Sequence, residues 1–103
     1  MAAPATVRTE WLPDLLAYAV HRQVEQYLQP MLDASQRIFP NARSIWVTLD
    51  PDPEIRDLSF ITYNVRIPSM PGAEALSLQR LWTDELVRLR PYPVIDGFVL
   101  LIE

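Results

Sequence analysis

Residues 44–67 have the sequence SIWVTLDPDPEIRDLSFITYNVRI, and this stretch decides the fold of the chain. Apolar and polar side chains alternate over residues 44–49 and again over residues 58–67, as in β-strands with one buried face. The eight residues between the two runs hold four carboxylates and two prolines, which are common in turns. Because this connection is short, the strands are predicted to pair antiparallel as a hairpin. One face of the hairpin would carry Ile45, Val47, Leu49, Ile61, Tyr63, Val65 and Ile67.

Two amphipathic helices are predicted to flank the hairpin. Residues 12–29 place apolar side chains at three- and four-residue steps, with Pro13 in a first turn that tolerates proline. Pro30 lacks a backbone donor, so a kink or a restart is expected there, with residues 31–38 helical again. A second helix is predicted over residues 73–90, and a third strand over residues 97–102. The apolar stripes are Leu16, Val20, Val24, Tyr27, Leu28 and Met31 on the first helix, and Ala75, Leu78, Trp82, Leu86 and Leu89 on the second.

These elements predict an α+β fold with the order α-β-β-α-β. We expect a three-stranded, mainly antiparallel sheet, in which a split β-α-β unit places the last strand beside the first strand and antiparallel to it. Both helices would pack on this sheet. The 103 residues suffice for a single domain with one core, and residues 1–10 are expected to be a loose N-terminal segment.

The composition excludes several classes of function. The chain has no cysteine, and all nine basic residues are arginine, so thiolate chemistry and lysine Schiff bases are excluded. There is one histidine and no glycine-rich phosphate loop, and no cofactor is expected. The formal net charge of −4 argues against binding to nucleic acid or to an anionic membrane. With neither a signal peptide nor an apolar run of transmembrane length, the expected location is the cytoplasm of a bacterium.

The turn between the two strands is a candidate metal site. Its carboxylates supply the oxygen ligands that Mg²⁺ and Ca²⁺ prefer, but the spacing lacks the glycine and the distal glutamate of an EF-hand loop. Aspartate and proline also favour turns for purely structural reasons, so we expect a structural turn without a metal. The alternative function is a divalent-metal-dependent hydrolase that uses Asp50, Asp52 and Glu54, with Asp57 nearby.

Two other groups of polar residues have ordinary explanations. His21 and Glu25 lie four residues apart on the first predicted helix, which favours a surface ion pair over a metal site. Arg80, Arg88 and Arg90 lie among acidic residues on the second helix. A solvated face with ion pairs is therefore predicted there, rather than a surface for single-stranded nucleic acid.

The predicted sheet has apolar residues on both faces. If the helices cover the face of Tyr63, a second apolar set is left on the other face and needs a cover of its own. We expect a homodimer through this face or through the edge of the last strand. The alternative is a monomer in which the first helix bends at Pro30 to cover the second face. The predicted interface residues are Trp46, Leu58, Phe60, Val99 and Leu101.

A wider pattern runs over about residues 31–90. A helix ends at Ile38-Phe39-Pro40, a strand follows over residues 45–49, and Asp52-Pro53-Glu54 precedes a long strand and an Ala/Leu-rich helix. This pattern resembles a family of small uncharacterised prokaryotic proteins with a helix–Phe-Pro–strand–"DPE"–strand–helix order. The family has no established activity, so the resemblance implies no catalytic residue. Some members of the family are the small partner in a two-gene pair with a toxin-like or enzyme-like neighbour, and the resemblance implies such a pair as an expectation for this chain.

The expected function is therefore a protein-interaction module rather than an enzyme. The acidity of the chain, the second apolar sheet face and the resemblance all favour this hypothesis. The expected partners are a second copy of the chain and a protein encoded nearby, as in a toxin–antitoxin-like system.

Overall fold

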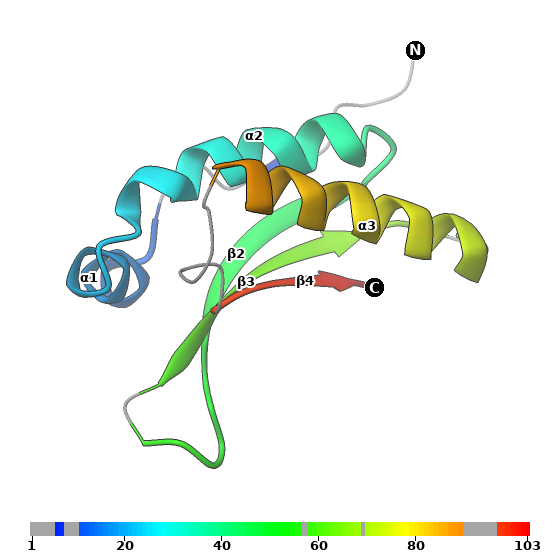
Figure 1. Cartoon of the computed structure of the whole chain (residues 1–103). Coiled ribbons are helices and arrows are strands. Elements are labelled where there is room, and N and C mark those ends of the chain that lie inside the picture. Colours follow the sequence, from blue (N-terminus) through cyan, green and yellow to red (C-terminus); the bar gives the residue numbers. More distant parts are fainter. Residues whose placement is uncertain (1–5, 8–10, 57, 69, 90–96) are drawn as a thin grey trace.

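The chain folds into a sheet with its helices packed on one side (Figure 1). The computed structural model describes residues 6–7, 11–56, 58–68, 70–89 and 97–103. It confirms the α+β class and the order α-β-β-α-β, adding a short strand before the first helix and dividing that helix in two. The elements are β1 (Thr6–Val7), α1 (Pro13–His21), a 3-10 turn (Glu25–Tyr27), α2 (Leu28–Ile38), β2 (Ser44–Pro51), β3 (Ser59–Arg66), α3 (Gly72–Leu89) and β4 (Phe98–Ile102).

The hairpin predicted from the alternating pattern is present as β2 and β3. The two strands pair antiparallel, in a register that places Ile45 opposite Val65 and Asp50 opposite Phe60. β1 pairs parallel with β2, although it belongs to the segment expected to be loose. The strand order in the sheet is β1-β2-β3-β4.

The last strand lies in a different place from the one expected. β4 lies beside β3 and runs parallel to it, with Leu100 opposite Tyr63, and it does not lie beside β2. The sheet is therefore mixed, and β3, α3 and β4 form an unsplit β-α-β unit. The reason is that β1 occupies the other edge of β2, while α3 carries the chain back along the sheet so that β4 enters parallel to β3.

The first predicted helix is interrupted before Pro30. α1 ends in a Schellman motif, in which the Val24 N–H donates to the Ala19 carbonyl at 2.8 Å and the Gln23 N–H donates to the Val20 carbonyl at 3.0 Å. Gln23 takes the left-handed conformation that this motif requires, with a φ of 61°. Pro30 lies in the first turn of α2, where the missing N–H costs no hydrogen bond, so it does not kink the helix.

The interruption also changes which residues of α1 are buried. Leu15 and Ala19 face the core, whereas Leu16 and Val20, which were expected in the core, are exposed. The break rotates the buried side of α2 relative to that of α1, so the single apolar stripe predicted over residues 12–31 does not continue from one helix to the other. The predicted stripe on α3 is confirmed, since Trp82 and Leu86 are buried in the core. No helix in the described part of the chain has the length and apolar character needed to cross a membrane.

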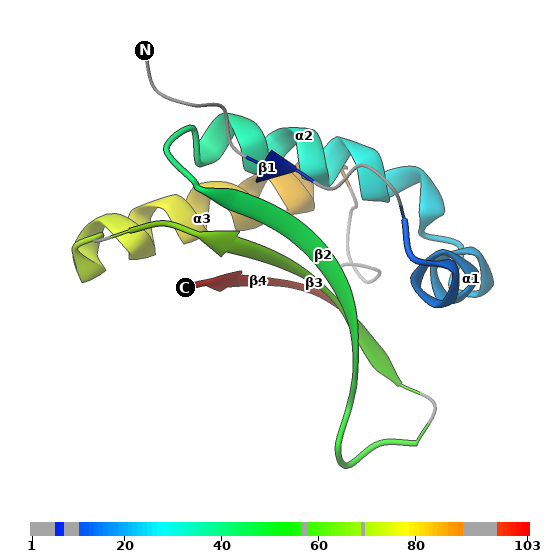
Figure 2. The ribbon, with the colours of Figure 1, turned by 180° about the vertical axis from the view of Figure 1, so that it is seen from behind.

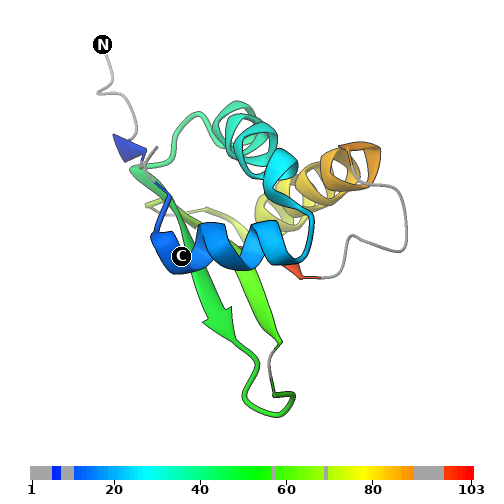
Figure 3. The same ribbon diagram turned by 90° about the vertical axis from the view of Figure 1, so that its left-hand side faces the viewer.

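All three helices lie over the same face of the sheet (Figures 2 and 3). Tyr63 lies at the centre of the core beneath them, where its ring stacks on Phe98 at 6.0 Å and meets Trp82 at 5.8 Å. Its hydroxyl donates to the carbonyl of Leu28 at 2.7 Å. Burial raises the pKa of the Tyr63 phenol far above its usual range, so it remains a donor at any physiological pH.

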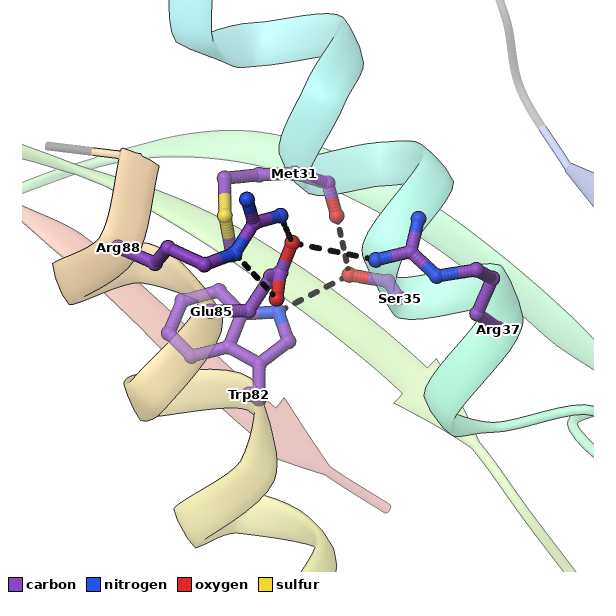
Figure 4. Close-up of polar contacts among 6 residues, drawn as sticks. All are labelled: Met31, Ser35, Arg37, Trp82, Glu85 and Arg88. Atoms are coloured by element: carbon purple, nitrogen blue, oxygen red, sulfur yellow. Dashed lines mark hydrogen bonds and ion pairs between the residues drawn. The ribbon is translucent and has the colours of Figure 1, made fainter.

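A buried polar chain joins α2 to α3 (Figure 4). The indole N–H of Trp82 donates to the hydroxyl of Ser35 at 3.0 Å, and this hydroxyl donates to the carbonyl of Met31 at 2.7 Å. At the surface beside it, the Glu85 carboxylate accepts from the Arg37 guanidinium at 3.2 Å and also pairs with Arg88. These contacts join α2 to α3 over the sheet.

Candidate protein-docking face

The other face of the sheet is not covered by any element of the described chain (Figure 2). Side chains alternate along each strand, and the register places Trp46 of β2, Asn64 of β3 and Leu101 of β4 in one row across the sheet. We call this surface the open face. Its residues are Ser44, Trp46, Thr48, Asp50, Leu58, Phe60, Thr62, Asn64, Arg66, Val99 and Leu101.

The open face has apolar residues around a polar centre. Trp46 and Phe60 are half-buried, while Val99 and Leu101 of β4 are 38% and 44% exposed. Thr62 and Asn64 occupy the central strand between them. They are only 6% and 5% exposed, although no helix covers them, because side chains of the neighbouring strands surround them.

Hydrogen bonding in the polar centre is incomplete. The Asn64 amide nitrogen donates to the carbonyl oxygens of Trp46 and Thr62, both at 3.2 Å, and to the Thr48 hydroxyl at 3.1 Å. These three acceptors assign the orientation of the amide group. Within the described residues, neither the side-chain oxygen of Asn64 nor the hydroxyl of Thr62 has a hydrogen-bond partner. Nearly all buried polar groups in proteins have one, so these two atoms are candidates for a group that arrives from outside the chain.

A stacked arginine lies at one end of the open face. The guanidinium of Arg66 is 5.5 Å from the centroid of the Trp46 ring, and it pairs with the Glu103 carboxylate at 3.6 Å. The side chain of Arg66 remains 59% exposed. Arginine and tryptophan are the residue types most enriched among those that dominate binding energy at protein interfaces.

The structure places the five predicted interface residues on one face of the sheet. Trp46, Leu58, Phe60, Val99 and Leu101 all belong to the open face, by their register or by continuation of the alternation in β3. The monomer in which a helix bends to cover this face is not what the structure shows, because α2 lies on the core side. Binding of a partner by these residues stays a prediction.

Sequence reasoning missed the polar centre of this face. The alternation places Thr62 and Asn64 on the same face as Phe60 and Arg66, but it does not predict that these two residues are nearly buried. The available signal was that they alternate with Ile61, Tyr63 and Val65 on a strand whose neighbours are apolar on both faces. A polar pair in the middle of such a strand is buried even when its own face is open.

The acidic turn is held by its own backbone. One carboxylate oxygen of Asp52 accepts the N–H groups of Glu54 at 2.7 Å and of Ile55 at 2.9 Å, which is the pattern of an Asx turn. Asp50 instead accepts the hydroxyl of Thr48 at 3.2 Å. No three acidic or histidine side chains gather closely enough to hold a metal ion in the described part of the chain, and Asp57 lies outside it.

The two other polar groups also occupy separate surroundings. The break after α1 separates His21 from Glu25, and no ion pair joins these two described residues. Arg88 pairs with Glu85 as part of the ion-paired surface described above, while Arg90 lies outside the described residues. The hydrogen bond from Arg88, with Arg37 also close, lowers the pKa of the Glu85 carboxyl.

A hollow of about 540 Å³ lies between the start of α1 and β2. Leu12, Leu15 and Leu49 form its apolar walls, and the exposed carboxylates of Asp14 and Asp50 lie at its border. It contains no histidine and no basic residue among its described lining. Its described lining therefore offers two carboxylates beside an apolar surface.

The chain was also compared with known proteins, and no family model, curated protein or solved structure matches it.

Proposed function

We propose that this chain is a non-catalytic protein-interaction module of the cytoplasm, and that its open face binds an amphipathic helix of a second protein. The observation that carries the proposal is the open face itself, where apolar residues surround Thr62 and Asn64. These two residues are 6% and 5% exposed, and the Thr62 hydroxyl and the Asn64 side-chain oxygen have no hydrogen-bond partner among the described residues. Sheet faces of this kind are usually covered by helices, as the core face of this sheet is.

The open face also indicates the chemistry of the helix that would cover it. The apolar stripe of that helix would lie against Trp46 and Phe60, which are large side chains already half-buried among their neighbours. A serine, threonine, asparagine or glutamine near the middle of the stripe would donate to the Asn64 side-chain oxygen and pair with the Thr62 hydroxyl. A wholly apolar helix would leave both atoms buried without partners, which costs about 1–3 kcal/mol for each of them.

The absence of cysteine and lysine, and the ordinary turn geometry of Asp52, support a role without catalysis. The resemblance described above supports a partner encoded by a neighbouring gene. In this proposal the chain is the small component of a two-protein complex, and the larger component supplies the helix.

A library of displayed helices tests the open face directly. Helices of about 20 residues, roughly 30 Å long, would be selected on phage against the wild-type chain. We expect enrichment of an i, i+3, i+4, i+7 apolar pattern with one polar position inside the stripe. The Trp46→Ala substitution should weaken the selected helices about 30-fold or more. The Val20→Ser substitution changes an exposed apolar residue of α1 and should leave their affinity unchanged.

The Thr62→Val substitution separates binding from folding. Valine has the shape of threonine without the unpartnered hydroxyl, so the isolated chain should be as stable as wild type or more stable. The same substitution should weaken the selected helices about tenfold, because the partner's polar group loses its hydrogen bond. If the selected helices bind Trp46→Ala and Thr62→Val as tightly as wild type, the open face is not the docking surface.

Co-expression tests the two-gene part of the proposal. The product of the adjacent gene should co-purify with the wild-type chain and with Val20→Ser, but not with Trp46→Ala. Failure of the wild-type chain to retain this product would disprove the two-gene part, and the result with displayed helices would stand on its own.

A further inference from the structure

The free edge of β4 is uncharged along its whole length. The strand Phe98–Ile102 has the sequence FVLLI, with no charge, proline or bulge to discourage pairing with another strand. It lies at the edge of the sheet among the described residues. Natural proteins usually protect such edges, because an apolar edge strand pairs readily with other chains.

Hydrogen bonds within the sheet show which backbone groups of β4 point outward. The Gly97 carbonyl accepts the Ile61 N–H at 2.7 Å, and the Glu103 N–H donates to the Val65 carbonyl at 2.8 Å. In a parallel ladder the residues bonded to the neighbour alternate along the strand, so Val99 also directs its backbone to β3. Leu100 and Ile102 therefore direct their N–H and C=O groups away from the sheet.

We propose that a second copy of this chain pairs with this edge, antiparallel and across a two-fold axis that passes beside Leu100. The N–H of each Leu100 then donates to the carbonyl of Leu100 in the partner, and the two sheets become one continuous eight-stranded sheet. This inference goes beyond the proposed function and does not depend on it.

The register of the two β4 strands in this dimer follows from the side chains of β4 and from the carboxylate of Glu103, which comes directly after the strand. With Leu100 opposite Leu100, Val99 lies opposite Leu101 of the partner subunit in a close, non-hydrogen-bonded pair, with Cα atoms about 4.5 Å apart. Glu103 then lies opposite a glycine, and its carboxylate stays with Arg66 of its own chain. A shift by one residue in each strand would instead set this carboxylate against Val99, so the proposed register avoids burying a charge.

The flank of α3 opposite Glu85 carries two exposed apolar residues, with Thr83 and Arg80 beside them. At 100° per residue, Leu76 and Val87 lie about half a turn away from Glu85, the residue that pairs with α2. They are 69% and 46% exposed and belong to the side of α3 that faces away from α2. Extension of the sheet would bring the same flank of a second α3 alongside, and so would cover both residues.

Sedimentation velocity and charge variants test the pairing. Wild type at tens of micromolar should sediment as a dimer of 11.9 kDa chains. Val99→Lys alone and Leu101→Glu alone should each be monomeric, with the dimer Kd raised about a hundredfold, because each places charges opposite apolar side chains. An equimolar mixture of the two variants should form a dimer again, since the ammonium group introduced by Val99→Lys in one chain then lies opposite the carboxylate introduced by Leu101→Glu in the other.

Controls separate this edge from the open face and from misfolding. Val20→Lys adds the same charge on α1 and should leave the dimer intact, as should Trp46→Ala on the open face. Circular dichroism and urea unfolding should show that the two charged variants are folded. A monomeric wild type, a dimeric Val99→Lys, or a mixture that stays monomeric would each overturn the proposal. Val99 and Leu101 also belong to the open face, so helix binding is tested separately by Trp46→Ala and Thr62→Val.

Discussion

Replacing Ser35 with alanine tests whether the buried polar chain between α2 and α3 stabilises the fold. Ser35 is fully buried and is the acceptor for the indole N–H of Trp82, which is itself only 3% exposed. In Ser35→Ala this N–H loses its partner in a place that water barely reaches. An orphaned buried donor costs about 1–3 kcal/mol, and the better helix propensity of alanine returns at most about 0.5 kcal/mol.

We therefore expect Ser35→Ala to lower the free energy of unfolding by about 0.5–2.5 kcal/mol, with the middle of this range at about 1.5 kcal/mol. For a domain of this size, the loss corresponds to a fall in Tm of roughly 10 °C. Urea unfolding followed by far-UV circular dichroism measures the change, with an unaltered m-value as the sign that the unfolding transition is otherwise the same.

A double-mutant cycle with Trp82→Phe tests the cause of this loss. Phenylalanine has no N–H, so in its presence the Ser35 hydroxyl donates only to Met31, whose carbonyl is a normal acceptor within the helix. Ser35→Ala should then cost less than about 0.5 kcal/mol, and the coupling energy between the two sites should be about 1 kcal/mol or more. An equal cost of Ser35→Ala in both backgrounds, or a cost below 0.5 kcal/mol in wild type, would refute the reasoning.

Three further substitutions have expected outcomes that urea unfolding also measures. Because its arginine partners lower the pKa of Glu85 in the folded state, the stabilisation is present above the ordinary pKa of 4.5 and is lost as pH falls through the lower folded value. Glu85→Gln should therefore be less stable than wild type at pH 7, and this difference should close as the pH is lowered to 3. Gly97→Ala should cost about 1–2 kcal/mol, because Gly97 has a φ of 107° and no atom lies within 4 Å of the added Cβ, so backbone strain alone acts. Gln23→Gly should raise stability by about 0.5–1 kcal/mol, since glycine is favoured at the left-handed position of the Schellman motif. A destabilised Gln23→Gly would contradict the helix-ending geometry described for α1.

The elements with long, regular patterns were predictable from the sequence. Alternation over residues 44–49 and 58–67 predicted β2, β3 and the sorting of their side chains between the two faces. The stripe through Trp82 predicted the buried side of α3. These elements were predictable because the periodicity of apolar residues along the sequence matches the burial of one side of the element. The match extends over two or more helical turns in α3 and over two or more pairs of alternating residues in each strand.

The features that were missed depend on short segments or on tertiary neighbours. β1 has only two residues, too few for a periodic signal, yet it occupies the edge of β2 where the last strand was expected. The end of α1 was hidden because glutamine, rather than glycine, takes the left-handed position. In the candidate site, the apolar residues were predicted, but the missing partners of Asn64 and Thr62 depend on which side chains surround them.

The order of strands in the sheet has a consequence for the route of folding. β2 and β3 are joined by a short turn, so their contacts close a small loop at little entropic cost. β3 and β4 are equally close in space, but residues 67–97 lie between them along the chain. Their pairing must wait until this longer loop closes, and contacts that are distant in sequence slow folding. We expect the hairpin to form early as a template, and β4 to dock late, with α3 laid over the sheet as the loop closes.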